Sequence, residues 1–301
     1  MTFAADDLMF RPGLMTGQRV LITGGGTGLG KVMAEACVML GAEVYICGRR
    51  GGVVEDTAKE LMAAHGGKVV GLACDIRVPE AIAEMLDAIW SDGGALTGLI
   101  NNAAGNFISR TEDLSARGFD AIANIVFRGS FFVTLECGKR WIAEGRRASV
   151  ISILTTWVWN GGPFTVPSAM SKAGLNAMTQ SLAVEWGGKG IRFNAIAPGP
   201  FPTEGMSARL NPGADGEAYS DMSANPLGRV GEMRELANLA VYLLHPLSGY
   251  VNGQTIAIDG AAFQATGGNF SALRAWDDAQ WDAVKQMIRA ANDKDRAQRT
   301  V

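Results

Sequence analysis

Short runs of apolar and β-branched residues alternate with longer amphipathic segments along most of this chain. Such alternation is typical of βαβ units, in which right-handed helical crossovers join parallel strands. It predicts an α/β fold with a doubly wound, mostly parallel sheet. The expected strands cover residues 19–24, 43–47, 68–75, 96–102, 148–154, 191–197 and 254–259, and the longest helical patterns cover 31–40, 116–145, 166–188 and 232–245.

No internal repeat, low-complexity tract or Pro/Gly/Ser linker interrupts this order, so residues 1–301 are expected to form a single domain. Three segments fall outside the pattern: an N-terminal extension at 1–17, a connection at 199–228 and a C-terminal helical extension at 265–301. The connection is dense in Pro, Gly, Asn and Asp. Because long connections beyond strand ends often cover active sites, it is predicted to be a substrate lid.

Residues 275–294, within the C-terminal extension, have the pattern of an amphipathic helix. Trp281, Val284 and either Met287 or Ile288 share one face of it. Such a face can cover another subunit or the edge of an active site, or it can pack on the core of its own chain. Packing on its own core is the commonest of these three arrangements.

Composition narrows the class of protein. A formal net charge of −3, with basic residues scattered among acidic ones, gives no electrostatic reason to bind nucleic acid. The N-terminal residues lack the basic cluster of a targeting segment, and no apolar stretch reaches the roughly 20 residues of a membrane span. We therefore expect a cytoplasmic protein without membrane association. Four well-separated cysteines fit reduced core thiols: Cys37, Cys47, Cys74 and Cys137.

The stretch "TGGGTGLG" (23–30) follows the first expected strand and opens the first helix. Glycines there permit a tight turn and close approach of the backbone, and the helix N-terminus presents unpaired N–H groups to a pyrophosphate. This position favours a Rossmann-like dinucleotide site over a merely glycine-rich turn. The residues expected at the cofactor are Thr23, Gly24, Gly26, Thr27, Gly28, Leu29 and Gly30.

The end of the second strand discriminates between cofactors. An acidic residue there accepts the ribose 2′-hydroxyl of NAD, whereas an arginine accommodates a 2′-phosphate. The sequence "CGRR" offers Arg49 and Arg50 and no carboxylate, and Lys31 adds a cation after the glycine loop. This composition favours NADP(H), with Arg49 at the phosphate and Arg50 more plausibly a solvated surface residue.

Further polar positions follow the later strands, at the edge where open α/β sheets bind ligands. "CDIR" places Asp75 and Ile76 beside the expected adenine, with Asp75 as acceptor for its amine. "NNAAG" places Asn102 and Ala103 near the cofactor, with Asn101 fixing the backbone, and "PGP" adds Pro198 and Gly199.

These motifs, with a lysine on a long helix, together resemble the short-chain dehydrogenase/reductase family over nearly the whole chain. The resemblance implies that Lys172 holds the nicotinamide ribose. It also implies a homotetramer formed through two long helices, here 116–145 and 166–188.

"NNAAGNF", "PSAMSKAG", "LAVEWGGKGIRFNAIAPGP" and "RLNPG" look like the 2,4-dienoyl-CoA reductases, a branch that reduces conjugated dienoyl thioesters with NADPH. That branch has serine where most of the family has the catalytic tyrosine, which accounts for Ser168 one turn before Lys172. In its mitochondrial members a tyrosine fifteen residues before the lysine, assisted by an asparagine, hydrogen-bonds the thioester oxygen. Here Trp157 and Arg128 occupy those two positions.

The chemistry of these departures restricts the reaction. Reduction of a ketone makes an alkoxide that needs a positioned acid, and an indole N–H is far too weak an acid. Reduction of a conjugated thioester makes an enolate, which needs donors or positive charge at its oxygen and can take its carbon proton from water. We hypothesise that Trp157 and Arg128 replace the tyrosine and asparagine. Ser168, Thr155, Thr156 and an ordered water all remain open as proton donors.

Substrate residues transfer from the resemblance one by one. Arg77 and Arg209 match arginines that contact the CoA part, and cations suit its phosphates. Phe107 lies in the shared "NNAAGNF", and Ser168 stands at the catalytic position. Aromatic residues expected to surround an acyl chain or an aromatic acid are Trp157, Trp159, Phe164 and Phe201. His65 and His245 form no metal site by sequence spacing.

The function that this sequence predicts is NADPH-dependent reduction of a conjugated enoyl or dienoyl thioester. Two alternatives stay open. The catalytic departures can mark a reductase of another activated alkene or carbonyl, or a catalytically impaired NADP-binding protein that keeps the glycine loop and Lys172.

Overall fold

A computed structural model describes residues 3–203, 225–266 and 271–298. Seven parallel strands form its sheet in the order β3-β2-β1-β4-β5-β6-β7. All seven expected strands are confirmed, with ends shifted by a few residues. Their bounds are β1 Arg19–Thr23, β2 Glu43–Gly48, β3 Lys68–Ala73, β4 Gly98–Asn101, β5 Ala148–Ile153, β6 Ile191–Pro198 and β7 Thr255–Ile258.

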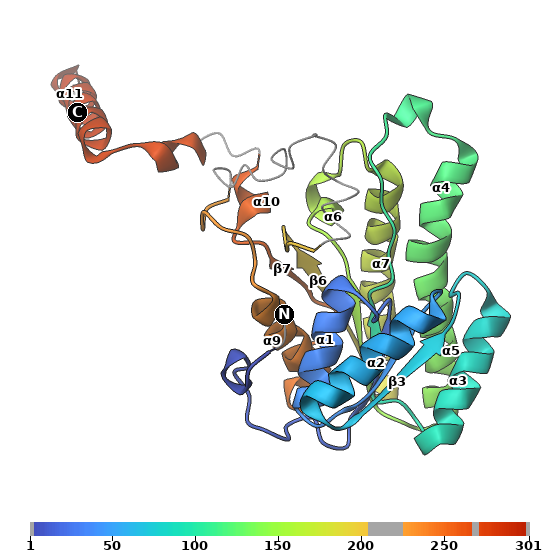
Figure 1. Ribbon diagram of the computed structural model, residues 1–301. Helices are drawn as coiled ribbons and strands as arrows, with labels where there is room; N and C mark the ends of the chain where they lie inside the picture. The colour runs from blue at the N-terminus through green and yellow to red at the C-terminus, as the bar shows by residue number, and fades with distance from the viewer. Residues whose placement is uncertain (1–2, 204–224, 267–270, 299–301) are drawn as a thin grey trace.

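Helices cover both faces of the sheet, as Figure 1 shows. The main ones are α1 Gly28–Met39, α2 Gly51–His65, α3 Pro79–Gly93, α4 Ala116–Ala123, α5 Ser130–Glu144, α7 Val166–Glu185 and α9 Met233–Leu244. Helices of four residues, α6 Trp157–Asn160 and α10 Ala262–Ala265, lie beyond the ends of β5 and β7, and α11 Asp278–Gln298 is near the C-terminus.

Side chains alternate between two cores along each central strand, because successive residues of a strand point to opposite faces. On β1, Val20 and Ile22 join the core under α1 and α9, whereas Leu21 joins the core under α3 and α5. All five residues of β1 are buried. This double burial explains why the central strands read as nearly continuous apolar runs.

The expected helix 116–145 is interrupted. A π-helical turn, η3 Asn124–Gly129, separates α4 from α5. Gly129 lies against Ile76 so closely that a Cβ there would be 2.8 Å from the isoleucine side chain. The turn therefore brings the helix backbone against the β3–α3 connection, beside the predicted adenine residues.

The combined helix Ala116–Glu144 is long and apolar enough to cross a membrane by length and composition. The expectation that no stretch reaches that length is wrong in this respect. Core helices of soluble proteins meet the same criterion, and α5 packs on α3 and on β4 as such helices do. The finding alone assigns no membrane role.

The two extensions behave differently. In the N-terminal one, Phe3, Leu8 and Met15 are buried in the core under α1. In the C-terminal one, α11 projects away from the sheet (Figure 1), with Trp281 and Met287 exposed. Packing on its own core, the commonest of the three arrangements, is therefore not the one observed. Most of the predicted lid lies outside the described residues, which include only 199–203 and 225–228 of it.

Candidate active site

The glycine loop between β1 and α1 is fastened to the end of β4. Thr23 Oγ1 accepts hydrogen bonds from the backbone N–H groups of Asn102 and Ala103, each at 3.0 Å. Asn102 Nδ2 donates in return to the carbonyl oxygens of Thr23 and Gly24. Gly24 has φ +65, and a Cβ on it would lie 2.9 Å from Ala103 Cα. The sequence thus places glycine where two strand ends come into contact.

Helix α1 starts at the loop with its N–H groups available. Its N-cap residue, Thr27, makes no side-chain cap, and no acidic residue lies in the first turn. Gly28, with φ +55, has only Thr203 within 4 Å of a built Cβ. Unpaired N–H groups at a helix N-terminus and a surface free of Cβ atoms suit a pyrophosphate. Gly26 holds the loop to α2 by accepting from Thr57 Oγ1 at 2.8 Å.

Arg49 and Asp75 lie close together because β2 and β3 are adjacent and parallel. Arg77 forms a hydrogen-bonded ion pair with the Asp75 carboxylate, donating from Nε to Oδ1 at 2.9 Å. The Arg77 guanidinium beside Asp75, with a smaller contribution from Arg49, holds the pKa of that carboxyl below its usual range. Arg49 is exposed at the strand end, where a 2′-phosphate would be bound. Lys31, the second predicted cation, is instead paired with Glu60 at 2.7 Å.

Lys172 comes from the first turns of α7 and reaches the end of β5. Its side chain is buried, and Nζ donates to the carbonyl oxygen of Ile153. Burial lowers the pKa of Lys172 to about 8, because desolvation disfavours the charged form. Ser168, also buried, lies one turn earlier on the same helix. The lysine and the serine are thus on one face, as the i, i+4 spacing requires.

Trp157 begins α6, just beyond β5. Its ring packs over Gly162, where a Cβ would be 2.9 Å from the indole. Arg128 lies in the π turn, donates from Nη1 to the carbonyl oxygen of Arg77 at 2.7 Å and covers the Phe132 ring at 4.9 Å. Among the described residues these two sets of contacts do not overlap. The joint role of Trp157 and Arg128 at one oxygen stays a prediction.

Asn101 is expected to fix the backbone around the cofactor, but Asn102 makes those bonds and Asn101 belongs to a buried polar cluster between the strand ends and α5, which the sequence did not predict. Asn101 and Ser152 are register partners on β4 and β5, and Asn101 Nδ2 donates to Thr134 Oγ1 at 2.8 Å. Asn101 Oδ1, Ser130 Oγ and Ser152 Oγ are buried without partners in the described part of the chain. Unpaired buried polar atoms lower the stability of the folded chain. Their presence next to Ile153 and Lys172 therefore indicates a region with a role other than stability. The available signal was Ser152, the second serine within the apolar run "ASVISI".

The predicted substrate residues lie in different parts of the structure. Phe201 is 2% exposed and belongs to the core under α1 and α9, and it also lines the cavity described below. That it surrounds an acyl chain stays a prediction. Phe107 packs on the smaller core that includes Leu175 of α7. Arg77 is partly exposed, and its guanidinium is occupied by Asp75. Arg209 lies outside the described residues.

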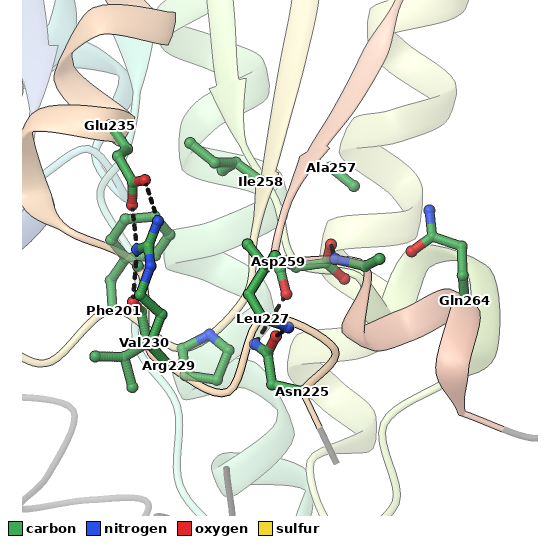
Figure 2. Close-up of a pocket in the computed structure, with 14 residues that line it drawn as sticks. Phe201, Asn225, Leu227, Arg229, Val230, Glu235, Ala257, Ile258, Asp259 and Gln264 are labelled. Atoms are coloured by element: carbon green, nitrogen blue, oxygen red, sulfur yellow. Dashed lines mark hydrogen bonds and ion pairs between the residues drawn. The ribbon is translucent and has the colours of Figure 1, made fainter. Parts of the chain in front are cut away.

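Two further features concern the residues after β6. Pro198 ends that strand, and Gly199 N–H donates to the Ile258 carbonyl oxygen at 3.0 Å. A cavity of about 390 Å³ opens between the ends of β6 and β7 and the start of α9. Figure 2 shows Arg229 paired with Glu235 on one side of this cavity and Asn225 bonded to Asp259 on the other. Phe201 itself lines the cavity, shortly after the end of β6.

No phenol from the described tyrosines reaches Lys172. Tyr45 belongs to β2 and donates to Asp92 at 2.7 Å, Tyr242 belongs to α9, and Tyr250 is fully exposed. Tyr219 lies outside the described residues. In the described ranges no group of three or more His, Cys, Asp or Glu side chains is placed to hold a metal ion.

Comparisons with known proteins point to one enzyme family. A family model described as enoyl-(acyl carrier protein) reductase matches residues 24–261. The chain is 43% identical over 95% of its length to an uncharacterized oxidoreductase of Caenorhabditis elegans, covering 92% of that protein. It is 41% identical over 96% of its length to a probable 2,4-dienoyl-CoA reductase of the same organism, covering 95% of it.

Among solved structures, a short chain dehydrogenase from Bacillus anthracis superposes with a TM-score of 0.75 at 39% identity, covering 82% of this chain and 97% of that one. Fold, motifs and sequence identity lead to the same assignment. The chain belongs to the short-chain dehydrogenase/reductase family and, within it, resembles the 2,4-dienoyl-CoA reductases.

Proposed function

We propose that this protein is an NADPH-dependent reductase of a conjugated enoyl or dienoyl thioester, with an acyl-CoA as substrate. One observation carries the proposal: Ser168 occupies the acid position one turn before a buried Lys172, in a chain 41% identical to a probable 2,4-dienoyl-CoA reductase. A serine hydroxyl is a poor acid at neutral pH, so a reaction that must protonate an alkoxide on the enzyme is disfavoured.

The residues present fit a dinucleotide. The N–H groups of α1 and the glycines of the loop would hold the pyrophosphate, Arg49 the 2′-phosphate, and Lys172 the nicotinamide ribose. When bound, the reduced nicotinamide supplies a hydride. Asn102 and Thr23 keep the loop and the end of β4 in register, so that cofactor and substrate meet beside β5.

The chain must then stabilise the enolate that hydride addition creates on the substrate. The indole N–H of Trp157, just beyond the end of β5, is a hydrogen-bond donor for the enolate oxygen. The Arg128 guanidinium supplies positive charge at this oxygen if it turns away from the Arg77 carbonyl oxygen and toward the substrate. The enolate carbon then takes its proton from water or from a hydroxyl of Ser168, Thr155 or Thr156. Arg209, and Arg77 through the part of its guanidinium that does not contact Asp75, would supply cations for the phosphates of CoA.

The test is oxidation of NADPH with a trans,trans-2,4-dienoyl-CoA, run beside a simple ketone and an enzyme-free control. We expect turnover of the dienoyl thioester and none of the ketone above the control. Turnover of the ketone alone would overturn the proposal. Binding of NADPH without turnover of either compound would reject it in favour of a cofactor-binding protein.

A further inference from the structure

An aromatic stack joins the two short helices α6 and α10, which lie near each other beyond the carboxyl ends of the strands in Figure 1. The rings of Trp159 and Phe263 are 4.5 Å apart and inclined by only 19°. A second link lies beside the stack, since the side-chain amide of Asn160 is hydrogen-bonded to Thr266 Oγ1 at 3.2 Å. We call Trp159, Asn160, Phe263 and Thr266 the clasp.

The Phe263 side of the clasp is held by a buried carboxylate. Asp259 is 8% exposed, and its two oxygens accept from the backbone N–H groups of Ala261 at 3.0 Å and Phe263 at 2.9 Å. Ala261 has φ +65, a strained value for a residue with a Cβ. Gly199 packs against Asp259, so that a Cβ on it would lie 2.7 Å from the Asp259 Cβ. Asp259 thus fixes where the Phe263 ring lies.

Aromatic surface remains exposed within the clasp and on the loop that follows α6. Trp159 is 43% exposed despite the stack, and Phe164, on the loop between α6 and α7, is 57% exposed. Phe164 also has φ +61, and its carbonyl oxygen accepts from Ser109 N–H at 2.9 Å. A strained backbone that presents an aromatic ring to solvent is a feature of binding sites rather than of stability.

The two tryptophans of α6 point in different directions. Residues two apart on a helix do not share a face, and here Trp157 lies over Gly162 whereas Trp159 lies over Phe263. A substrate with its oxygen at Trp157 would therefore meet the aromatic surface of Trp159 with a more distant part. That surface has an open indole face and lacks a charged group within the stack, which suits an alkyl chain.

We propose that the clasp is the chain-length determinant of this enzyme: Trp159 and Phe263 bind the alkyl chain beyond the reacting carbons, and Asp259 is the positioning residue that sets Phe263. The substrate class rests on the function proposed above. Sequence reasoning had included Trp159 among the expected aromatic residues, but it had no reason to add Phe263 or Asp259.

The test is equilibrium binding of saturated butanoyl-CoA and decanoyl-CoA to the NADP⁺-loaded protein, because these ligands require no turnover. The wild type should bind decanoyl-CoA more tightly. Phe263→Ala should weaken decanoyl-CoA binding about tenfold or more and butanoyl-CoA binding less than about twofold, because only the longer chain reaches the ring. Phe263→Tyr, which keeps the ring, should restore the preference, and Leu247→Ala, an exposed apolar residue on η6 Pro246–Ser248, should not alter it.

Asp259→Asn keeps one acceptor oxygen and loses the other. It should raise the KM for long dienoyl thioesters while kcat and the affinity for NADPH stay within about twofold, and its effect should not add to that of Phe263→Ala. Equal losses for short and long ligands, additive effects, or no preference in the wild type would overturn the clasp. A wild type that prefers decanoyl-CoA yet reduces no dienoyl thioester would leave the clasp standing and reject the proposed reaction.

Discussion

At the residue scale, the Lys172 ammonium is buried and bonded to a backbone carbonyl, so its charged form is costly in the folded chain. Its pKa falls to about 8 on folding from its ordinary value of 10.5. Below about pH 8 both the folded and unfolded chains hold the proton, and the full cost is present. Above it the folded chain binds fewer protons than the unfolded chain, so stability gained from this group increases with pH.

Lys172→Met removes this titration. We expect the free energy of unfolding of the wild type, relative to that of Lys172→Met, to increase by about 2 kcal/mol between pH 7 and about pH 9.5. Urea unfolding of both proteins in the absence of cofactor measures it, and the subtraction cancels the titration of groups they share. A difference that stays constant with pH would show that the lysine is solvated.

The role of Arg49 at the 2′-phosphate can be tested directly by measuring cofactor preference. Arg49→Ala should weaken NADPH binding about tenfold to a hundredfold, the range for charge-assisted hydrogen bonds to a phosphate, and leave NADH binding nearly unchanged. Arg50→Ala is the matched control, because the neighbouring arginine is expected to be solvated. Equal effects of the two substitutions, or equal losses for both cofactors, would contradict the assignment of Arg49 to the 2′-phosphate.

Residue types at strand ends were predictable, but their pairings were not. Asn102 and Thr23 were expected at the cofactor because each follows a strand, and their contact follows from the adjacency of β1 and β4. That Arg77 would occupy the Asp75 carboxylate depends on a local side-chain conformation which no spacing encodes. The core position of Phe201 likewise depends on Gly231, far along the chain, against which its ring packs.

At the element scale, the glycine loop makes a prediction with an internal control. A Cβ on Gly30 would overlap the Gly24 carbonyl oxygen and lie 2.5 Å from Asn102 Nδ2, whereas one on Gly52 would meet nothing within 4 Å. Gly30→Ala should lower the free energy of unfolding by about 1–3 kcal/mol and weaken NADPH binding. Gly52→Ala, within α2, should be neutral or stabilising by up to about 1 kcal/mol. Thermal unfolding with and without NADPH measures both, and similar losses in the two variants would contradict the packing described.

The central strands were predictable because they are buried on both faces, and such strands consist of nearly continuous apolar residues. The break at Asn124–Gly129 was not, because the apolar periodicity continues through it and the cause, the contact of Gly129 with Ile76, is tertiary. The amphipathic pattern of α11 predicted the helix correctly but not its packing, since the pattern says only that one face needs a partner.

At the scale of the whole molecule, the homotetramer expected from the family resemblance stays a prediction. Phe131 on α5 is 40% exposed, on one of the long helices expected to form the interface. Light scattering after gel filtration should give four chain masses for the wild type and a smaller assembly for Phe131→Glu, because burying a carboxylate is costly. Met9→Glu, which changes an exposed residue of the N-terminal extension, should keep the tetramer. A wild-type monomer would reject the expectation.

We propose that hydride addition here yields an enolate protonated on carbon, without a phenolic acid from the tyrosines in the described ranges. The most direct test is to reduce a 2,4-dienoyl-CoA with NADPH in deuterated water near neutral pH and to examine the product by mass spectrometry and NMR. We predict one deuterium from solvent bound to carbon, at an enolate carbon of the acyl chain, and an intact thioester. A product that carries no carbon-bound deuterium from solvent, because an oxygen was protonated instead, would contradict the account.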